Sequence, residues 1–495
     1  YQALNTILPK FKEEVQTIYI DPPYNTGSDG FLYRDNYQYS SWLSMMENRL
    51  NLAKESICET GNILISIGDT IKTNVSINSY SKLLSLLNEI FGENNFIATF
   101  VRKSGIAPRQ DIKHIANAHD YVVFYAKNKD NIVVNQKLAN LNRLKYRDNY
   151  FEERGFFDLN QLDRGSKQYS DSLDYPIKIK KGDVIEIFDG KDFNKIISPE
   201  DFAIYPGQDP SDKRWIFTWS KEKVLWGIKY DFIVFRKDKK NKWKVYYKEY
   251  ELVDNSLNRR ERKNPYDTFI MESYNEIGNN EIENLFKMRL FEYPKPTSLV
   301  THLIKIASMS DSIILDFFAG SGTTAHAVMK QNKEDGGKRK FILIEMANCF
   351  DTVINPRIKK VAYSFNWKDG TPKDTNGGGG FFKYYELEQY EEALANCKYE
   401  DGDLFNTPGR SPYQEYVFMK DEKILKALEI DYKEDKVKVD LSKLYPNIDI
   451  AETLSNLTGK WIKKISDDEV EFEDGTKINT KDLDYKLIKP LIWWE

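Results

Sequence analysis

The tetrapeptide Asp21-Pro22-Pro23-Tyr24 combines residue types that could act on a nucleobase amine. The exocyclic amine of a base is a poor nucleophile, because its lone pair is delocalised into the ring. A carboxylate and a carbonyl held rigid by two prolines could accept both amine hydrogens and favour attack by the nitrogen. Tyr24 could stack on a base that has left the duplex. The alternative is a proline-rich turn that merely ends a strand, but this four-residue pattern rarely arises by chance.

A second motif, residues 316–324 with the sequence DFFAGSGTT, joins an acidic residue to a glycine-rich turn. Glycines allow the backbone to turn tightly and to approach a ligand closely. Asp316 disfavours a phosphate ligand and favours a cationic one, such as the amino group and sulfonium of S-adenosylmethionine. Glu345 ends the next expected strand, where an acidic residue can hold ribose hydroxyls. The candidate cofactor-binding residues of this motif are Asp316, Phe318, Gly320, Ser321, Gly322, Thr323 and Glu345.

Two other kinds of nucleotide site share part of the glycine pattern. A dinucleotide-binding site also has a downstream acidic residue, but Ala325 stands where its third glycine is usual. Because alanine is sometimes allowed there, the sequence leaves this alternative open. A P-loop is excluded more firmly, because no Gly-Lys-Ser or Gly-Lys-Thr follows the glycines.

Both motifs directly follow apolar runs that predict buried strands, residues 15–20 and 313–315. Strands that alternate with helices form mostly parallel sheets, and ligands bind at the carboxyl ends of such strands. The two motifs should therefore lie at one edge of an α/β sheet. Further strands are expected at 62–67, 96–102, 121–126 and 341–344, and helices at 40–53, 81–91, 297–308 and from the glycines through 329.

Changes in composition and in the expected helix and strand pattern divide the chain into four regions. Residues 1–128 and 286–385 have α/β character and should form the two parts of one Rossmann-like catalytic sheet. Residues 129–285 are dense in Lys, Arg, Tyr, Trp and Asn, which predicts an irregular, β-rich insertion. Residues 386–495 are acidic and mixed, and we expect them to form a small C-terminal domain.

The composition is that of a globular protein, with 41% hydrophobic and 30% charged residues. No apolar run is long enough to span a membrane, and no signal-like leader opens the chain, so a cytoplasmic location is expected. The three cysteines and four histidines lack metal-ligand spacing, so we expect no protein metal site. A net charge of −4 does not by itself indicate a nucleic-acid partner.

The order of the motifs, DPPY before FxGSGTT with an insertion between them, resembles the β class of DNA amino-methyltransferases. Longer stretches resemble the modification subunit of type III restriction-modification systems over nearly the whole chain, as does the Trp-Trp end. These stretches are residues 19–27, 161–170, 219–227, 291–299, 317–327 and 451–457.

This resemblance implies methyl transfer from S-adenosylmethionine to a flipped adenine N6 in double-stranded DNA, with residues 129–285 as target-recognition domain. It also implies a homodimer and a restriction subunit that supplies the ATPase and nuclease. Lys295, Pro296 and Leu299 would help to line the methionine side of the cofactor site. The family has a further segment ahead of position 1, so some cofactor contacts would lie outside this sequence.

Two alternatives accompany this interpretation. The first is methylation of cytosine N4, although that class usually begins its tetrapeptide with Ser rather than with Asp21. The second is a specificity subunit that mainly recognises DNA for a nuclease partner.

Basic clusters interleaved with aromatic residues are concentrated in the insertion. Such side chains could contact DNA phosphates or base edges, and any single cluster could equally be a solvated loop. The candidate DNA-binding residues are Arg102, Lys103, Arg109, Arg143, Lys145, Arg147, Arg236, Arg259 and Arg260.

Overall fold

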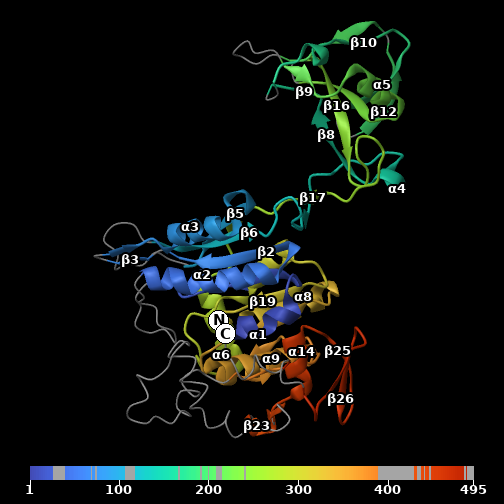
Figure 1. Ribbon diagram of the computed structural model, residues 1–495. Coiled ribbons are helices and arrows are strands. Elements are labelled where there is room, and N and C mark those ends of the chain that lie inside the picture. Colours follow the sequence, from blue (N-terminus) through green and yellow to red (C-terminus); the bar gives the residue numbers. More distant parts are fainter. Residues whose placement is uncertain are drawn as a thin grey trace. The chain divides into compact units, whose positions relative to one another are not determined.

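The computed structural model separates into two compact units, one of residues 1–135 and 267–495 and one of residues 136–266 (Figure 1). Each unit has its own sheet and core and is described by itself. The residues that the structure describes are 1–25, 39–68, 70–72, 75–105, 117–165, 168–189, 192–198, 200–207, 215–238, 241–387, 428–431, 436–439, 441–444, 447–483 and 487.

The first unit is built on a seven-stranded sheet with the strand order β18-β5-β6-β2-β1-β19-β20. Neighbouring strands are parallel except around β6, which runs antiparallel to both β2 and β5. The expectation of a mostly parallel α/β sheet is confirmed. The strands are β1 (Val15–Ile20), β2 (Ile57–Ile67), β5 (Phe96–Lys103), β6 (His119–Ala126), β18 (Phe269–Ile270), β19 (Ile313–Asp316) and β20 (Lys340–Leu343).

Strand β1 lies in the middle of this sheet, and every one of its residues is buried. It pairs in parallel with β19, with Ile18 opposite Leu315. Parallel strands in register bring their carboxyl ends to the same edge of a sheet. Asp21, directly after β1, and Asp316, the last residue of β19, therefore lie at one edge.

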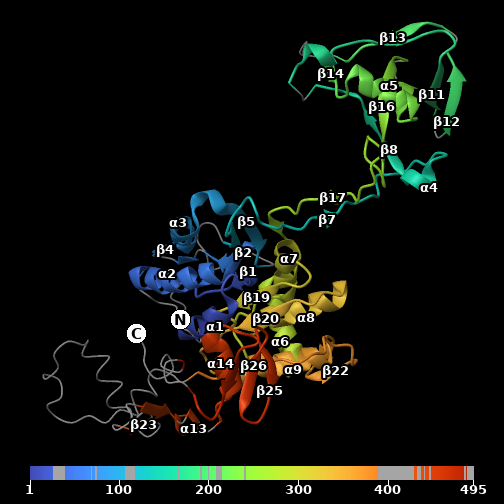
Figure 2. The same cartoon turned by 45° about the vertical axis from the view of Figure 1, so that its right-hand side comes forward.

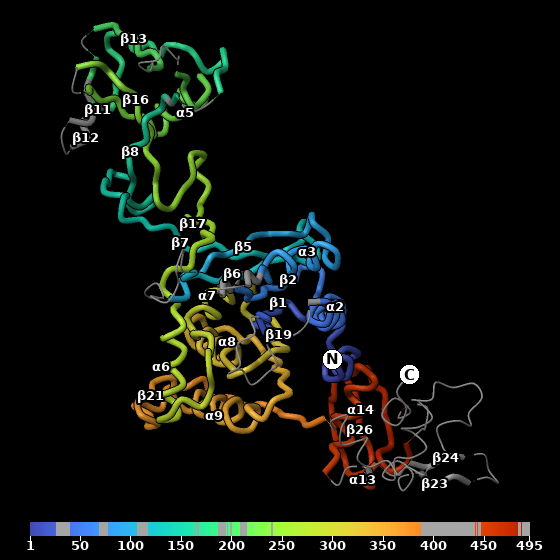
Figure 3. Tube along the Cα trace, turned by 90° about the vertical axis from the view of Figure 1, so that its left-hand side faces the viewer, coloured from blue at the N-terminus to red at the C-terminus, as the bar shows by residue number. Residues whose placement is uncertain are grey.

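Helices cover both faces of the sheet (Figure 3). Helices α2 (Tyr39–Ser56) and α3 (Ser79–Phe91) share a hydrophobic core with β1, β2 and β6. On the other side, α7 (Thr297–Ala307) packs against α8 (Thr323–Asp335). Their apolar residues recur at helical spacing, so each helix has one face that it must bury. The remaining helices of this core are α1 (Gln2–Phe11), α6 (Asn275–Phe286) and α9 (Asn355–Tyr363), and α9 directly follows a π-helix, η3 (Phe350–Ile354).

The C-terminal part of the described chain packs on the N-terminal helix. Lys10 of α1 donates to Ser455 Oγ at 2.7 Å and forms an ion pair with Glu452 at 3.7 Å, both on α14 (Ile450–Thr458). Leu454, Val470 and Phe472 form a small separate core beside it. The elements here are β23 (Leu428–Asp431), β24 (Lys436–Val439), α13 (Leu441–Leu444), β25 (Ile462–Ile465), β26 (Glu469–Phe472) and β27 (Lys477–Asn479).

Short elements complete the first unit. They are the pairs β3 (Thr70–Lys72) with β4 (Val75–Ile77) and β21 (Trp367–Lys368) with β22 (Thr371–Pro372), and the 3-10 turn η1 (Glu93–Asn95). Among the described residues, no helix combines the length and apolar character that crossing a bilayer requires.

The second unit is β-rich, with a five-stranded sheet in the order β12-β11-β15-β16-β8 and one helix, α5 (Lys221–Lys229), beside it (Figure 2). Its strands are β8 (Phe157–Gln161), β11 (Val184–Asp189), β12 (Asp192–Ile197), β15 (Ile233–Lys237) and β16 (Trp243–Tyr250). Shorter elements are the pairs β7 (Lys137–Leu138) with β17 (Lys263–Asn264), β9 (Asp163–Arg164) with β14 (Ile216–Phe217) and β10 (Ile177–Ile179) with β13 (Phe202–Ile204), together with α4 (Phe151–Arg154) and η2 (Asp171–Leu173).

This unit is shorter at both ends than the insertion expected over 129–285. Asn135 belongs to the first unit, because its side-chain amide donates to the backbone oxygens of Lys305 and Ser308. Residues 267–285 also belong there, because β18 extends the seven-stranded sheet beside β5 and α6 follows it.

Candidate active site

Asp21 is held by a lysine that is remote in sequence. Lys295 Nζ donates to both carboxylate oxygens of Asp21, at 2.7 and 2.6 Å. The side chains are 12% and 25% exposed, so the ion pair is sheltered but still reached by water. The same Nζ lies 4.9 Å from the centre of the Tyr24 ring. Lys295, expected beside the cofactor, thus meets two residues of the tetrapeptide.

Side chains from α2 and α3 fix the backbone of the tetrapeptide. Trp42 Nε1 donates to the Pro23 carbonyl at 2.8 Å, and Ser79 Oγ donates to the Tyr24 carbonyl at 2.7 Å. The Pro23 oxygen is therefore already engaged. Among the described residues, no backbone or side-chain donor bonds to the Pro22 oxygen. Nothing local in the sequence distinguishes Trp42 and Ser79 from other helix residues, so this role could not be predicted.

The ring of Tyr24 packs closely against Gly68. A Cβ at position 68 would lie 2.9 Å from the ring, so glycine is required for this approach. The Tyr24 hydroxyl and Asp120 Oδ1 are both buried without a hydrogen-bond partner among the described residues. Burial, with the charges of Asp21 and Asp120, raises the pKa of Tyr24 well above its usual range, so the hydroxyl stays protonated.

Arg102 is fully buried rather than available to DNA. Its guanidinium forms an ion pair with Asp120 at 3.1 Å, and it also donates to the Ser273 carbonyl and to Asn275. Burial raises the pKa of Asp120, and the charges of Arg102 and Lys295 oppose this rise. The expectation that Arg102 contacts DNA is therefore corrected, because β18 and the start of α6 enclose its side chain. Asp120, which was not among the candidate site residues, lies beside the tetrapeptide.

Asp316 is a buried carboxyl, only 2% exposed, at the start of the glycine turn. Its Oδ1 accepts from the Phe318 amide at 3.1 Å, and its Oδ2 accepts from Thr324 Oγ1 at 2.5 Å. Burial is the main cause that raises the pKa of Asp316 to about 7, against these hydrogen bonds and with a contribution from the charges of Asp21 and Glu345. A cation placed beside this carboxyl would stabilise its ionised form.

The turn itself depends on glycine conformations and on Glu345. Gly320 and Gly322 have φ values of +54° and +74°, which other residues adopt only with strain. The Gly320 amide donates to Glu345 Oε2 at 2.8 Å, and the amides of Met346 and Ala347 donate to Oε1. Glu345 thus stabilises the turn, and contact with ribose hydroxyls stays a prediction.

One cavity contains residues of both motifs. Expected site residues that line it are Asp21, Pro23, Lys295, Asp316, Phe318, Gly320, Ser321 and Thr323. Phe291, Tyr293 and Thr324 also line it, together with Tyr19, Pro294 and Ala319, and were not expected. The residues lining this cavity do not include Pro22, Tyr24, Pro296, Leu299, Gly322 or Glu345. Leu299 has no exposed surface and belongs to the core face of α7.

A family model described as DNA methylase matches residues 15–355, a range that includes both motifs and the cavity. The chain belongs to this DNA methylase family. Three relatives illustrate its relationships. The type III restriction-modification enzyme EcoPI Mod subunit of Escherichia phage P1 is 30% identical over 402 residues, 74% of this chain and 58% of the relative. The StyLTI Mod subunit of Salmonella typhimurium is 29% identical, over 82% of this chain and 63% of the relative.

The type II methyltransferase M.KpnI of Klebsiella pneumoniae is 28% identical, over 70% of this chain and 77% of the relative. The chain thus matches 58% and 63% of the lengths of the two type III relatives. A solved putative DNA modification methylase from Thermus thermophilus covers 72% of this chain and 91% of its own, with 12% identity and a TM-score of 0.33. The fold assignment of this methylase therefore rests on its own strand order.

A buried arginine absent from the prediction connects the glycine turn with the start of α7. Arg357 Nη1 donates to Ser321 Oγ and Thr323 Oγ1, both at 3.0 Å, and Nη2 donates to Thr297 Oγ1 at 3.3 Å. Glu281 lies 3.6 Å away as its ion-pair partner. Burial lowers the pKa of Arg357 to about 10, so it is still a cation at neutral pH. Its contact with Thr297, the first residue of α7, lies two residues after Lys295.

Most of the candidate DNA-binding residues of the methylase are exposed, and they lie in its second unit. Lys103, in the first unit, is partly buried, with its Nζ 5.6 Å from the centre of the Tyr274 ring. Arg109 lies outside the described residues. The exposed candidates are Arg143, Lys145, Arg147, Arg236, Arg259 and Arg260.

Proposed function

We propose that this chain is an enzyme that transfers a methyl group from S-adenosylmethionine to adenine N6 in double-stranded DNA. The observation that carries the proposal is the single cavity in which the Asp21 carboxylate faces the acidic, glycine-rich turn. Membership of the DNA methylase family gives the class of substrate. The relatives named as type III Mod subunits and type II methyltransferases support the same class of reaction.

The residues of the cavity suit S-adenosylmethionine. Asp316 offers a buried carboxyl to a cationic group, and burial raises its pKa to about 7. The glycine turn leaves room for close approach of a ligand, and Phe291 and Phe318 provide aromatic surface for an adenosine. Lys295 lies at the side expected to hold the methionine end. When bound, this cofactor supplies a methyl group on a positively charged sulfur, which makes that carbon electrophilic.

Asp21 orients the amine that attacks. Its carboxylate and the Pro22 carbonyl would accept the two N6 hydrogens, which localises the nitrogen lone pair toward the methyl carbon. As the N–C bond forms and the bond between the methyl carbon and sulfur breaks, positive charge develops on the nitrogen. Asp21 would stabilise that charge and would accept the departing proton. Lys295 now occupies both Asp21 oxygens, so the amine has to displace it from at least one of them.

The wider assembly belongs to the same proposal. We propose that the flipped adenine stacks near Tyr24 and that the second unit recognises the target sequence. The relatives are named as Mod subunits of type III restriction-modification enzymes, and we propose that this chain likewise lends its specificity to a restriction subunit. The homodimer and the cytoplasmic location expected from the sequence are part of the same proposal.

Mass spectrometry of nucleosides tests the reaction. The full chain is incubated with plasmid DNA and S-adenosylmethionine carrying a deuterated methyl group, and the DNA is digested to nucleosides. We expect labelled N6-methyladenine. Labelled N4-methylcytosine would instead establish the cytosine alternative, and the absence of both products would contradict methyl transfer.

Asp21→Ala tests the role of the carboxylate. We expect it to abolish methyl transfer while calorimetry shows cofactor binding within a fewfold of wild type. Asp467→Ala is the matched control, because Asp467 is exposed in the C-terminal region, far along the chain from both motifs. Methylation by Asp21→Ala at the rate of the control variant would refute the assigned role.

A further inference from the structure

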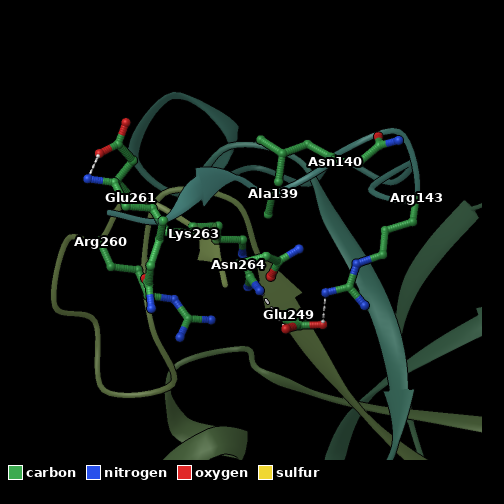
Figure 4. Close-up of a pocket in the computed structure, with 11 residues that line it drawn as sticks. Ala139, Asn140, Arg143, Glu249, Arg260, Glu261, Lys263 and Asn264 are labelled. Carbon is green, nitrogen blue, oxygen red and sulfur yellow. Dashed lines mark hydrogen bonds and ion pairs between the residues drawn. The ribbon is translucent and has the colours of Figure 1, made fainter. Parts of the chain in front are cut away.

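The second unit has a polar cavity of about 620 Å³ at the point where its chain begins and ends (Figure 4). Its walls come from residues within 136–143, from residues 260–264 and from Glu249 of β16. The two flanking strands, β7 and β17, pair with one another here, with Lys137 opposite Asn264. The cavity is therefore formed by residues of the second unit alone.

A glutamate organises two of the arginines in this cavity. Glu249 accepts hydrogen bonds from Arg143 Nη2 at 2.9 Å and from Arg262 Nη1 at 2.5 Å, one on each carboxylate oxygen. Arg262 also donates through Nε to the Tyr250 carbonyl at 2.7 Å, and its side chain is only 8% exposed. These bonds hold both guanidinium groups in defined orientations around the cavity.

Arg260 differs from the other cations of the lining in that its counter-charge, Asp254, lies beyond ion-pair distance and outside the cavity lining. It is exposed at the cavity wall, and within the described part of the chain it forms no ion pair. Glu261, the other carboxylate of the lining, is already paired with Lys263 at 2.8 Å. The lining holds four cations and two carboxylates, so two positive charges are in excess. The crowding of like charges favours an anion in this space.

We propose that this cavity binds one phosphate group of the DNA backbone, with Arg260 as the principal contact. The inference rests on the proposed function, which makes duplex DNA the substrate. Guanidinium groups bind phosphate oxygens through two parallel hydrogen bonds, and the amide side chains of Asn140 and Asn264 add neutral donors.

A phosphate contact carries no information about base sequence. The part of the second unit where its chain begins and ends would therefore bind the DNA backbone whatever the base sequence. Other parts of the second unit would recognise the bases. This separates Arg260 from residues that determine specificity. It also makes the contribution of Arg260 measurable on DNA that lacks the unknown target site.

The test measures binding of the full chain to two 30-base-pair duplexes of unrelated sequence over a series of salt concentrations. For Arg260→Ala we expect the slope of log affinity against log salt to become shallower by about 0.9, the value for one lost phosphate contact. At 0.1 M salt this corresponds to about eightfold weaker binding, equal for both duplexes. Arg260→Lys keeps the charge and should restore the slope.

Arg259→Ala is the matched control, because Arg259 is the adjacent exposed arginine and does not line the cavity. It should leave the slope closer to wild type than Arg260→Ala does. An unchanged slope for Arg260→Ala, an equal loss for Arg259→Ala, or a loss on one duplex alone would each overturn the assignment. If the wild-type chain bound neither duplex at any salt concentration, the DNA substrate itself would be wrong, which is a separate failure of the proposed function.

Discussion

Asp316→Asn tests the electrostatic description of the cofactor turn. Folding removes this carboxyl from water, and among the described residues it has hydrogen-bond donors but no ion-pair partner. Its pKa therefore rises from an ordinary 3.8 to about 7. Asparagine keeps the size and one acceptor oxygen but cannot ionise. The variant should therefore lose whatever pH dependence this one group gives to stability.

The sign and size of that dependence follow from the two pKa values. The folded state binds the proton more tightly than the unfolded state. Below pH 3.8 the Asp316 carboxyl is protonated in both states, so it costs no stability there. Its cost grows as pH rises toward 7 and is then constant, at about 4 kcal/mol. Between pH 5 and pH 8, wild type should lose about 2.5 kcal/mol relative to Asp316→Asn.

Hydrogen exchange measures this difference within the first unit. Exchange of the β19 amides is followed at pH 5, 6, 7 and 8 in both proteins, and the rates are corrected for the intrinsic exchange rate at each pH. These amides report opening of the seven-stranded sheet even when the two units unfold separately. Asp467→Asn, an exposed acid, should run parallel to wild type at every pH. A stability difference between Asp316→Asn and wild type that is constant from pH 5 to pH 8 would refute the reasoning.

Two further substitutions examine the packing around the cavity. Arg357→Met should destabilise the first unit by about 3 to 5 kcal/mol, because it leaves Glu281 and the glycine turn without their buried partner. Thermal unfolding measures this loss of stability, and a loss below 1 kcal/mol would show that the cation is dispensable. Gly68→Ala should displace the Tyr24 ring, since its Cβ would lie 2.9 Å from that ring. We expect about a tenfold slower single-turnover methyl transfer with unchanged cofactor affinity by calorimetry, and equal rates in the two proteins would contradict the packing argument.

The strand-end position of both motifs could be predicted because it depends on local patterns. A buried β-branched run followed by Asp21, and another ending in Asp316, place two acidic residues at one sheet edge once the strands are parallel. The direction of β6 could not be predicted in this way. An apolar run such as residues 121–126 has no polarity, so it does not show which way the strand runs.

Long-range pairing explains what the prediction missed. Arg102 stands next to another basic residue and looks solvated, but residues 273 and 275, far along the chain, enclose it. Arg357 likewise gives no local sign that it reaches the glycine turn. Residues 267–285 resemble the insertion in composition, yet their two-residue strand β18 adds to the catalytic sheet.

The chain leaves the first unit after Asn135 and returns at Asp267, and the strands next to these crossings, β7 and β17, lie side by side. An insertion whose ends meet can change in length and sequence while the order of the seven strands of the first unit stays the same. If the second unit recognises the target, as proposed above, recognition and catalysis are free to evolve at different rates. Exchange of the gene segment that encodes residues 136–266 would then change the target and leave Asp21 and Asp316 in place.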